Sequence, residues 1–145
     1  MSGGTWERTA SIVNNGNSNL TTYGSQIMAD LNNGGSTKYI TVYPHDSSKD
    51  NTSISNTDAN LNTANQANYV KNTKIYGDGI RETSTAGTGK SSWYSDYSYF
   101  AGLYSPFFLR GGYSGDTSGA GLFSFLRLNG NSSYSRGFRS VLVSL

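Results

Sequence analysis

The chain has 145 residues, the length of one domain, and folding at this size buries about two thirds of the surface that the unfolded chain exposes. Its net charge is only +2, and the Lys and Arg residues are scattered, so the sustained basic surface of a nucleic-acid-binding protein is not expected. The chain has no cysteine, which excludes disulfide bonds, thiolate metal sites and a cysteine nucleophile.

Composition predicts an ordered, loop-rich protein. Hydrophobic residues make up 34% of the chain and charged residues 14%, so Ser, Thr, Asn and 18 Gly supply much of the rest. Disordered chains combine low hydrophobicity with few aromatics, whereas 13% of these residues are aromatic. No apolar run approaches the ~20 residues of a membrane helix, and the first residues lack the pattern of a signal peptide. We expect no direct membrane insertion, and we expect the chain to be the C-terminal domain of a longer protein.

The N-terminal part predicts one strand clearly and a second less clearly. Trp6 to Val13 reads as a strand with Trp6, Ile12 and Val13 buried, and the Asn-Asn-Gly that follows is a turn signal. Lys38 to Tyr43, just before a proline, fits either a short strand or an extended loop.

A helix is predicted between these two segments. Apolar residues recur there at spacings of three and four, at Leu20, Tyr23, Ile27 and Leu31. Ser18 or Asn19 is available as the N-cap, and Gly34 is available as the stop.

The middle of the chain divides into a polar excursion and a second organised block. Asp46 to Asn68 is almost wholly polar and predicts a long surface excursion, with one helical stretch around 60–70. Tyr69 to Thr83 begins the second block. Aromatic residues that we expect to close the core follow at Trp93, Tyr94, Tyr97, Tyr99 and Phe100.

The last third alternates two compositions. Segments rich in Gly, Phe and Arg predict short buried strands with tight turns, at Phe107–Gly112, Ala120–Phe125 and Gly137–Leu142. The residues between them are those that recognition loops use, at Tyr113–Ser118, Leu126–Asn129 and Asn131–Arg136. The pattern predicts a binding surface mounted on a frame.

Strand alternation gives finer expectations for this region. Phe123 and Phe125 are expected to point inward, and Leu122, Ser124 and Leu126 the other way. The paired glycines at 111 and 112 permit a positive φ or a close backbone approach.

Two arginines lie in apolar strand segments. Arg110 and Arg139 each need a partner if they are buried, and Asp78, Glu82 and backbone carbonyls are the candidates. The alternative is that both arginines are partly exposed.

The order of these motifs resembles a known family. A Gly-Asp-x-x-x-Glu segment at 77–82, then Arg-Gly-Gly, then a terminal Gly-Phe-Arg resemble the C-type lectin-like fold of the formylglycine-generating-enzyme branch. The chain is more similar to the variable proteins of diversity-generating retroelements, in which the region from Arg-Gly-Gly to Gly-Phe-Arg is rewritten at adenine-derived codons. The matching residues are Arg110, Gly111, Gly112, Ala120, Gly121, Phe123, Gly137, Phe138 and Arg139.

The resemblance implies a fold and a function. The fold is α+β and C-type lectin-like, a single domain over 1–145 with short antiparallel sheets, one or two helices and long loops, and a variable recognition region at about 110–142. The implied function is non-catalytic receptor binding by a phage tip or a bacterial surface adhesin, outside the cell, with a protein or glycan on another cell as the partner. The expected ligand contacts are Tyr113, Ser114, Asp116, Ser124, Leu126, Leu128, Asn129, Ser133, Tyr134, Ser135 and Arg136.

Other readings remain to be compared with this one. A structural decoration domain of a virion or pilus is the alternative, with an oligomer left open. We expect no enzyme, because formylglycine-generating enzymes act through cysteines and the single histidine, His45, lies in a turn-like segment. Gly87–Ser91 lacks the first glycine of a phosphate-binding loop. We expect no cofactor and no calcium-dependent sugar site, because the acidic residues are dispersed; a structural ion on Asp96 or Asp116 stays open.

Overall fold

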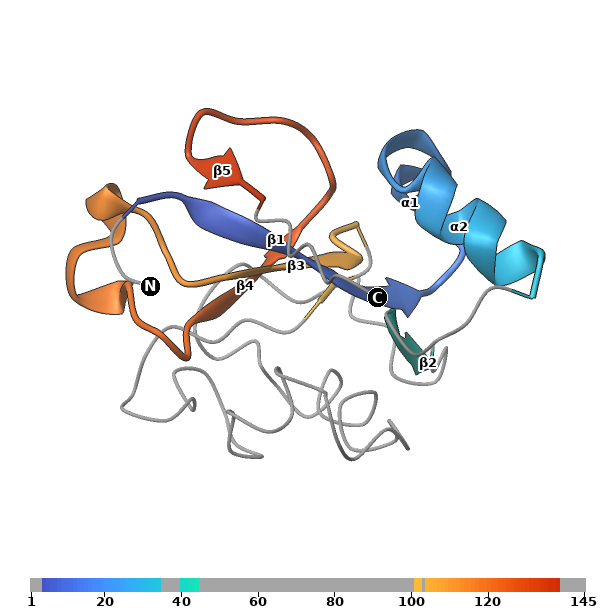
Figure 1. The fold of residues 1–145 in the computed structure, drawn as a ribbon, viewed down its shortest axis with the longest axis horizontal. Coiled ribbons are helices and arrows are strands. Elements are labelled where there is room, and N and C mark those ends of the chain that lie inside the picture. Colours follow the sequence, from blue (N-terminus) through green and yellow to red (C-terminus); the bar gives the residue numbers. More distant parts are fainter. Residues whose placement is uncertain (1–3, 35–39, 45–100, 103, 139–145) are drawn as a thin grey trace, which may run out of the picture.

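A computed structural model describes residues 4–34, 40–44, 101–102 and 104–138 (Figure 1). The elements are β1 (Trp6–Asn14), α1 (Ser18–Tyr23), α2 (Ser25–Asn32), β2 (Thr41–Pro44), β3 (Phe107–Arg110), the 3-10 helix η4 (Ser114–Gly119), β4 (Phe125–Leu128) and β5 (Arg136–Gly137). Several predictions concern residues outside this set. They are the helical stretch at 60–70, the block at 69–83, the aromatic cluster at 93–100, and the statements on His45, Gly87–Ser91, Asp78, Glu82, Asp96 and Arg139.

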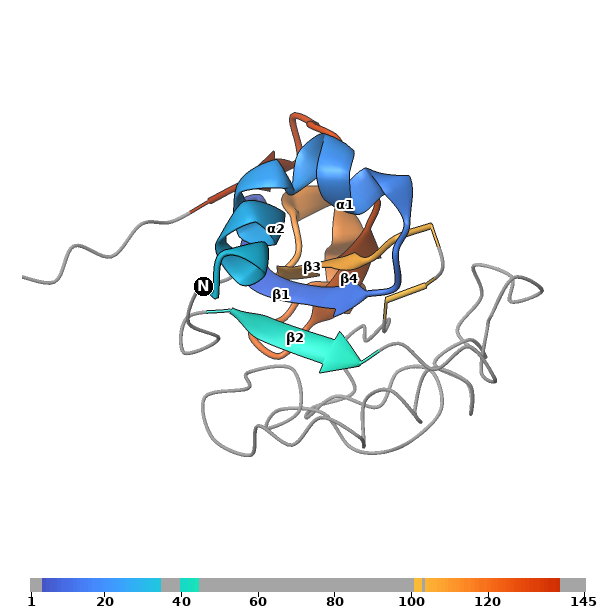
Figure 2. The same cartoon turned by 90° about the vertical axis from the view of Figure 1, so that its right-hand side faces the viewer.

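The strands form one mixed sheet built around β1. Along one edge β1 pairs with β3 in antiparallel orientation, and β3 then pairs with β4. Along its other edge β1 pairs in parallel with β5 at Trp6–Glu7 and with β2 at Ser11–Asn14, and Figure 2 shows β2 beside β1. Among the described residues the α+β class with two helices is confirmed, but the expectation of antiparallel sheets is wrong there because β2 and β5 both run parallel to β1.

The predicted first strand is confirmed, including its three buried residues Trp6, Ile12 and Val13. The Lys38–Tyr43 segment forms the strand β2 from Thr41 onward. The Asn-Asn-Gly turn that ends β1 is also present, because Gly16 adopts a φ of +73° that only glycine adopts readily.

A bulge in β1 separates its two halves. The register between β1 and β3 shifts between Arg8 and Ile12, and in the bulge the Thr9 hydroxyl donates to the carbonyl of Phe108 (3.2 Å). Bulges bend a strand and redirect side chains. Arg8 is paired directly with Leu109, so its side chain leaves the sheet on the side of that leucine.

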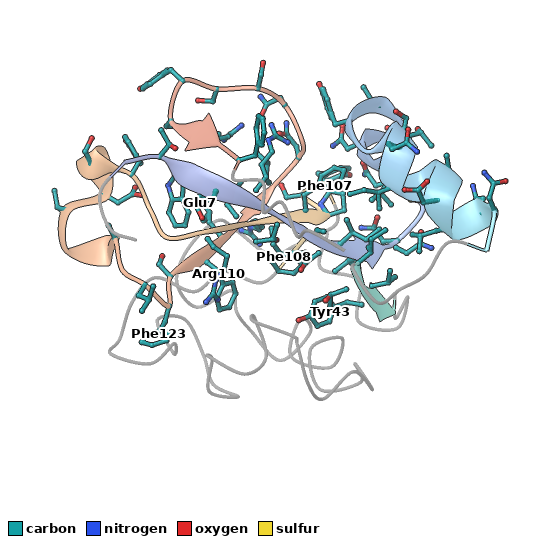
Figure 3. All side chains as sticks on the ribbon, viewed as in Figure 1. Glu7, Tyr43, Phe107, Phe108, Arg110 and Phe123 are labelled. Atoms are coloured by element: carbon teal, nitrogen blue, oxygen red, sulfur yellow. The ribbon has the colours of Figure 1, made fainter. Side chains whose placement is uncertain are left out.

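The sheet is apolar on both faces. Side chains opposite each other in β3 and β4 share a face, so Phe107 lies with Leu128 on one side and Phe108 with Arg127 on the other. The helix-side core consists of Trp6, Ile12, Leu20, Phe107, Leu109 and Leu128. The aromatic core, on the opposite face, consists of Val13, Tyr43, Ala101, Phe108 and Phe125. Figure 3 shows Tyr43 and Phe108 on this opposite side. Their ring centroids are 5.5 Å apart.

The predicted single helix is two helices joined at Gly24. A Cβ at Gly24 would lie 2.8 Å from the ring of Phe107 and 2.9 Å from the carbonyl oxygen of Leu20, so only glycine fits where the chain passes over the sheet. The break changes the phase of the apolar pattern: Tyr23, expected on the apolar face, is 47% exposed, whereas Ile27 and Leu31 pack against the helix-side core.

The ends of the helical segment are defined by an asparagine and a glycine. The N-cap is Asn17, not Ser18 or Asn19, because the Asn17 side-chain oxygen accepts a hydrogen bond from the backbone N–H of Asn19 (2.9 Å). Gly34 has a φ of +74° just after α2, which confirms the predicted stop.

Candidate functional site

The candidate site comprises two loops, the first loop (Gly111–Ser124), which contains η4, and the second loop (Asn129–Ser135). In Figure 1, η4 lies near the beginning of β1, whereas the second loop arches from β4 toward α1 and returns to β5. Most of the predicted ligand contacts lie in these loops. The two loops are held in different ways.

Paired glycines close the base of the first loop. Gly111 and Gly112 have φ values of +93° and +96°, and a Cβ at Gly112 would lie 2.8 Å from Ala120. The N–H of Gly111 donates to the carbonyl of Ser124 (3.0 Å), and the N–H of Gly121 donates to the carbonyl of Gly111 (3.0 Å). The expectation that the Gly-Gly pair permits a positive φ or a close backbone approach is confirmed, since both are found here.

Two predicted ligand contacts also shape the first loop. The N–H of Tyr113 donates to the Asp116 carboxylate (2.9 Å), and the N–H of Asp116 donates to the carbonyl of Tyr113 (3.0 Å). The ring of Tyr113 lies over Gly115, where an added Cβ would be 2.6 Å from it. The β-branched Thr117 has a φ of 49°, a conformation that costs energy in such residues. The first loop is therefore compact and closed by its own residues.

The second loop begins at a glycine that packs on a helix. Gly130 has a φ of +112°, and a Cβ there would collide with Cβ of Tyr23 and lie 2.8 Å from the ring of Phe107. The N–H of Asn131 donates to the side-chain oxygen of Asn129 (3.2 Å). Close contact with α1 thus fixes the start of this loop.

Hydroxyls meet near the end of the second loop. The Oγ atoms of Ser133 and Ser135 are 3.1 Å apart, and the carbonyl of Ser135 accepts a hydrogen bond from the N–H of Trp6 (2.8 Å). Tyr134, between the two serines, is 92% exposed. The loop therefore holds its serines against one another while its tyrosine faces solvent.

Two arginines converge on the backbone of the second loop. Arg8 donates from Nη1 to the carbonyl of Gly130 (2.9 Å) and from Nη2 to the carbonyl of Asn131 (2.6 Å). Arg136 donates from Nη1 to the same Asn131 carbonyl (3.0 Å) and also to the Asn131 side-chain oxygen. Burial, and then the charge of Arg8, lowers the pKa of the Arg136 guanidinium.

Sequence reasoning named Arg136 as a contact and missed Arg8. The available signal was a cation inside a strand, between the buried Trp6 and Ile12. Its partners are carbonyls more than a hundred residues away, and no sequence pattern marks a carbonyl as an acceptor.

The predicted contact residues differ widely in exposure. Ser114 and Tyr134 are exposed, and partly buried positions are held by Tyr113, Asp116, Leu126, Asn129, Ser133, Ser135 and Arg136. Ser124 and Leu128 are buried, at 0% and 3% exposure, so their assignment to the outer surface is wrong.

The two errors have separate causes. Leu128 is paired with Phe107 and belongs to the helix-side core. Ser124 closes a turn, donating its N–H to the carbonyl of Gly121 (3.1 Å), so strand alternation begins only at Phe125. The expected outward position of Ser124 is wrong for that reason, while Leu122 is exposed as expected.

The arginine of the Arg-Gly-Gly motif has an acidic neighbour. Arg110 is partly buried and is paired with Glu7 across β1 and β3. Opposite charges directly across two antiparallel strands stabilise the pair by roughly 0.2–1 kcal/mol. Sequence reasoning had not considered Glu7 as a neighbour of Arg110.

The described residues include neither a metal-binding cluster nor a membrane-spanning helix. They contain no group of three or more His, Asp or Glu side chains that could hold a metal ion. In the same part of the chain, no helix has the length and apolarity needed to cross a membrane.

Comparisons with protein-family models, curated proteins and solved structures found no match to this chain.

Proposed function

We propose that the chain is a non-catalytic binding domain with a C-type lectin-like fold, of the kind used by the variable proteins of diversity-generating retroelements. Its two loops present side chains to a protein or glycan receptor on another cell. The observation that supports this best is the contrast between the strands and the loops. Phe108, Leu109 and Phe125 in the strands are at most 1% exposed, whereas Tyr134 in the second loop is 92% exposed.

An ordered loop with an exposed tyrosine is suited to binding. A large aromatic side chain supplies contact area with little rotamer entropy, and serine and asparagine supply adaptable hydrogen bonds. The backbone of the second loop is already held by Arg8, so little conformational entropy remains to be lost on binding.

The family motifs also have physical roles that support the proposed fold. The Gly-Gly pair of the Arg-Gly-Gly motif adopts positive φ, and Gly112 lies against Ala120, another matching residue. Gly137 of the Gly-Phe-Arg motif lies in β5, where a Cβ would be 2.8 Å from the Thr5 hydroxyl oxygen. Larger residues at these glycines would disturb the strands that support the loops.

Sequencing the DNA that flanks the gene tests the proposed origin of the loops. We expect a near-copy of the coding region for Arg110 to Leu142, differing only at template adenines, beside a reverse transcriptase gene. Absence of such a copy would overturn the proposal that the loops are diversified. Receptor binding and a structural role in a virion or pilus would then be equally well supported.

A cell-binding assay tests receptor binding directly. Fluorescently labelled chain is added to a panel of bacterial cells and binding is measured by flow cytometry. Tyr134→Ser should weaken binding to a positive strain by at least a few fold, because it removes the exposed aromatic ring of the second loop. Ser18→Ala, an exposed change on α1, is the matched control. A structural domain would bind no strain, and its loop variants would instead disturb assembly of the particle.

A further inference from the structure

Arg8 and Arg136 form a cationic pair at the base of the second loop. Both donate to the carbonyl of Asn131, so the donating nitrogens lie within two hydrogen-bond lengths of each other. Like charges this close repel one another. Burial, and after it the charge of Arg8, lowers the pKa of Arg136.

The described part of the chain supplies no carboxylate to this pair. It contains three acidic residues. Glu7 lies opposite Arg110 in the register of β1 and β3, and strand alternation places it on the opposite face of the sheet from Arg8. The Asp30 carboxylate accepts from Gln26, and the Asp116 carboxylate accepts from the backbone of the first loop.

The donors that remain have a useful geometry. The Nη1 atom of Arg136 directs its hydrogens to the carbonyl and side-chain oxygens of Asn131. The Nε and Nη2 atoms of Arg136 have no acceptor among the described residues. The N–H bonds on this edge of a guanidinium are parallel to each other. Such an edge matches the two oxygens of a carboxylate. Arg8 is held by the carbonyls of Gly130 and Asn131 and adds a second, fixed positive charge.

The residues next to Arg136 in the chain are suited to a sugar. The hydroxyls of Ser133 and Ser135 precede Arg136 in the chain, and small hydroxyls exchange hydrogen bonds readily with sugar hydroxyls. Two aromatic residues, Tyr134 at 92% exposure and Phe138 at 82%, flank Arg136 at a spacing of two residues. Their rings offer flat apolar surface for the face of a saccharide ring.

We propose that Arg8 and Arg136 bind the carboxylate of an acidic saccharide, with Arg136 making the paired contact and the ring of Tyr134 lying against the sugar. This inference rests on the proposed binding function and names the ligand chemistry of the second loop. The Nε and Nη2 edge of Arg136 has to be accessible for the contact, and Arg136 is only partly buried.

Titration calorimetry of the full chain tests the proposal. The probe is 3′-sialyllactose, with lactose as the uncharged analogue and 3-sulfated lactose as a second anion. We expect sialyllactose to bind at least about tenfold more tightly than lactose. The reason is that lactose lacks the carboxylate, and hydrogen bonds to charged groups are stronger than those between neutral groups. Binding of the sulfated sugar alone would overturn the assignment to a carboxylate.

Variants locate the contact. Arg136→Lys keeps the charge but loses the parallel N–H pair, and we expect sialyllactose to bind about tenfold more weakly. Tyr134→Ser should weaken the binding of both sugars by a few fold, because the ring that lies against the sugar is lost. The fold should be unaffected, because this ring is 92% exposed. The control is Arg127→Lys, because Arg127 is paired with Phe108 and so points to the opposite face of the sheet. Thermal melting of each variant reports whether it folds.

The outcomes separate this proposal from the proposed function. Cell binding that sialyllactose does not inhibit, with equal binding by Arg136→Lys, would overturn the acidic saccharide and leave receptor binding intact. Binding of a tetraglutamate peptide but of no acidic sugar would assign the pair to an acidic protein surface instead and overturn the saccharide. A chain that binds neither cells nor probes would contradict both proposals.

Discussion

The first and second loops reach an ordered shape by different routes. The first loop is closed by bonds among its own residues, such as the reciprocal pair between Tyr113 and Asp116. The second loop is held from outside, by Arg8 of β1 and by contact between Gly130 and Tyr23 of α1. The shape of the first loop therefore depends on local sequence, whereas that of the second depends on the tertiary fold.

The largest effect is expected from Gly130→Ala, which acts on the second loop. The φ of +112° is unfavourable for alanine, and the new Cβ would collide with Tyr23 and Phe107. We expect the free energy of unfolding to fall by about 2–4 kcal/mol, measured by urea denaturation. Gly16→Ala is the matched control, because Gly16 has a φ of +73° with nothing near its Cβ position. Equal losses in the two variants would mean that contact with α1 contributes nothing.

Arg8→Met tests the external anchor itself. Methionine retains apolar contact along the stem but removes the donors to the Gly130 and Asn131 carbonyls. We expect a loss of about 1–3 kcal/mol. Hydrogen exchange should accelerate at the amides of the second loop and stay unchanged in the first loop. Equal acceleration in both loops would contradict the distinction drawn between them.

Asp116→Ala tests the self-contained loop. The substitution removes the acceptor for the Tyr113 N–H at the start of η4, where such a bond contributes about 1 kcal/mol. We expect a loss of that size and faster hydrogen exchange near η4 alone. Asp116→Asn keeps an acceptor oxygen and should lose less. Faster exchange in the second loop would show that the two loops are coupled.

Ser124→Ala should have the smallest effect and the opposite sign. The Ser124 hydroxyl is fully buried and has no hydrogen-bond partner among the described residues. Removing an unsatisfied buried polar group should leave the free energy of unfolding unchanged or raise it by up to about 1 kcal/mol. A clear loss of thermal stability in Ser124→Ala would indicate that the hydroxyl has a partner in the folded protein.

Local signals in the sequence predicted local structure well. The buried positions of β1, the stop at Gly34 and the positive φ values at Gly111 and Gly112 each depend on a few neighbouring residues. The sequence predicted one continuous helix where the structure has two, because the break at Gly24 arises from its contact with the ring of Phe107. A periodic pattern records the spacing of residues and cannot record such a contact.

The composition of the site was easier to predict than its construction. Ser114 and Tyr134 are exposed as expected, but a turn reverses the expected alternation at Ser124 and the sheet buries Leu128. Arg8 was missed because its acceptors are carbonyls, which every residue possesses. Side-chain types alone therefore predicted some of the exposed loop residues but not the strand that supports the loop.

The anchoring of the second loop by backbone atoms separates the shape of the loop from the identity of most of its side chains. Arg8 binds the carbonyl oxygens of Gly130 and Asn131, and a carbonyl oxygen is present whichever amino acid occupies position 131. Positions 131–135 can then exchange residues while Arg8 keeps the same two acceptors, and Gly130 is the position that the packing on Tyr23 holds constant. A loop attached in this way can change its side chains without a new support for each sequence.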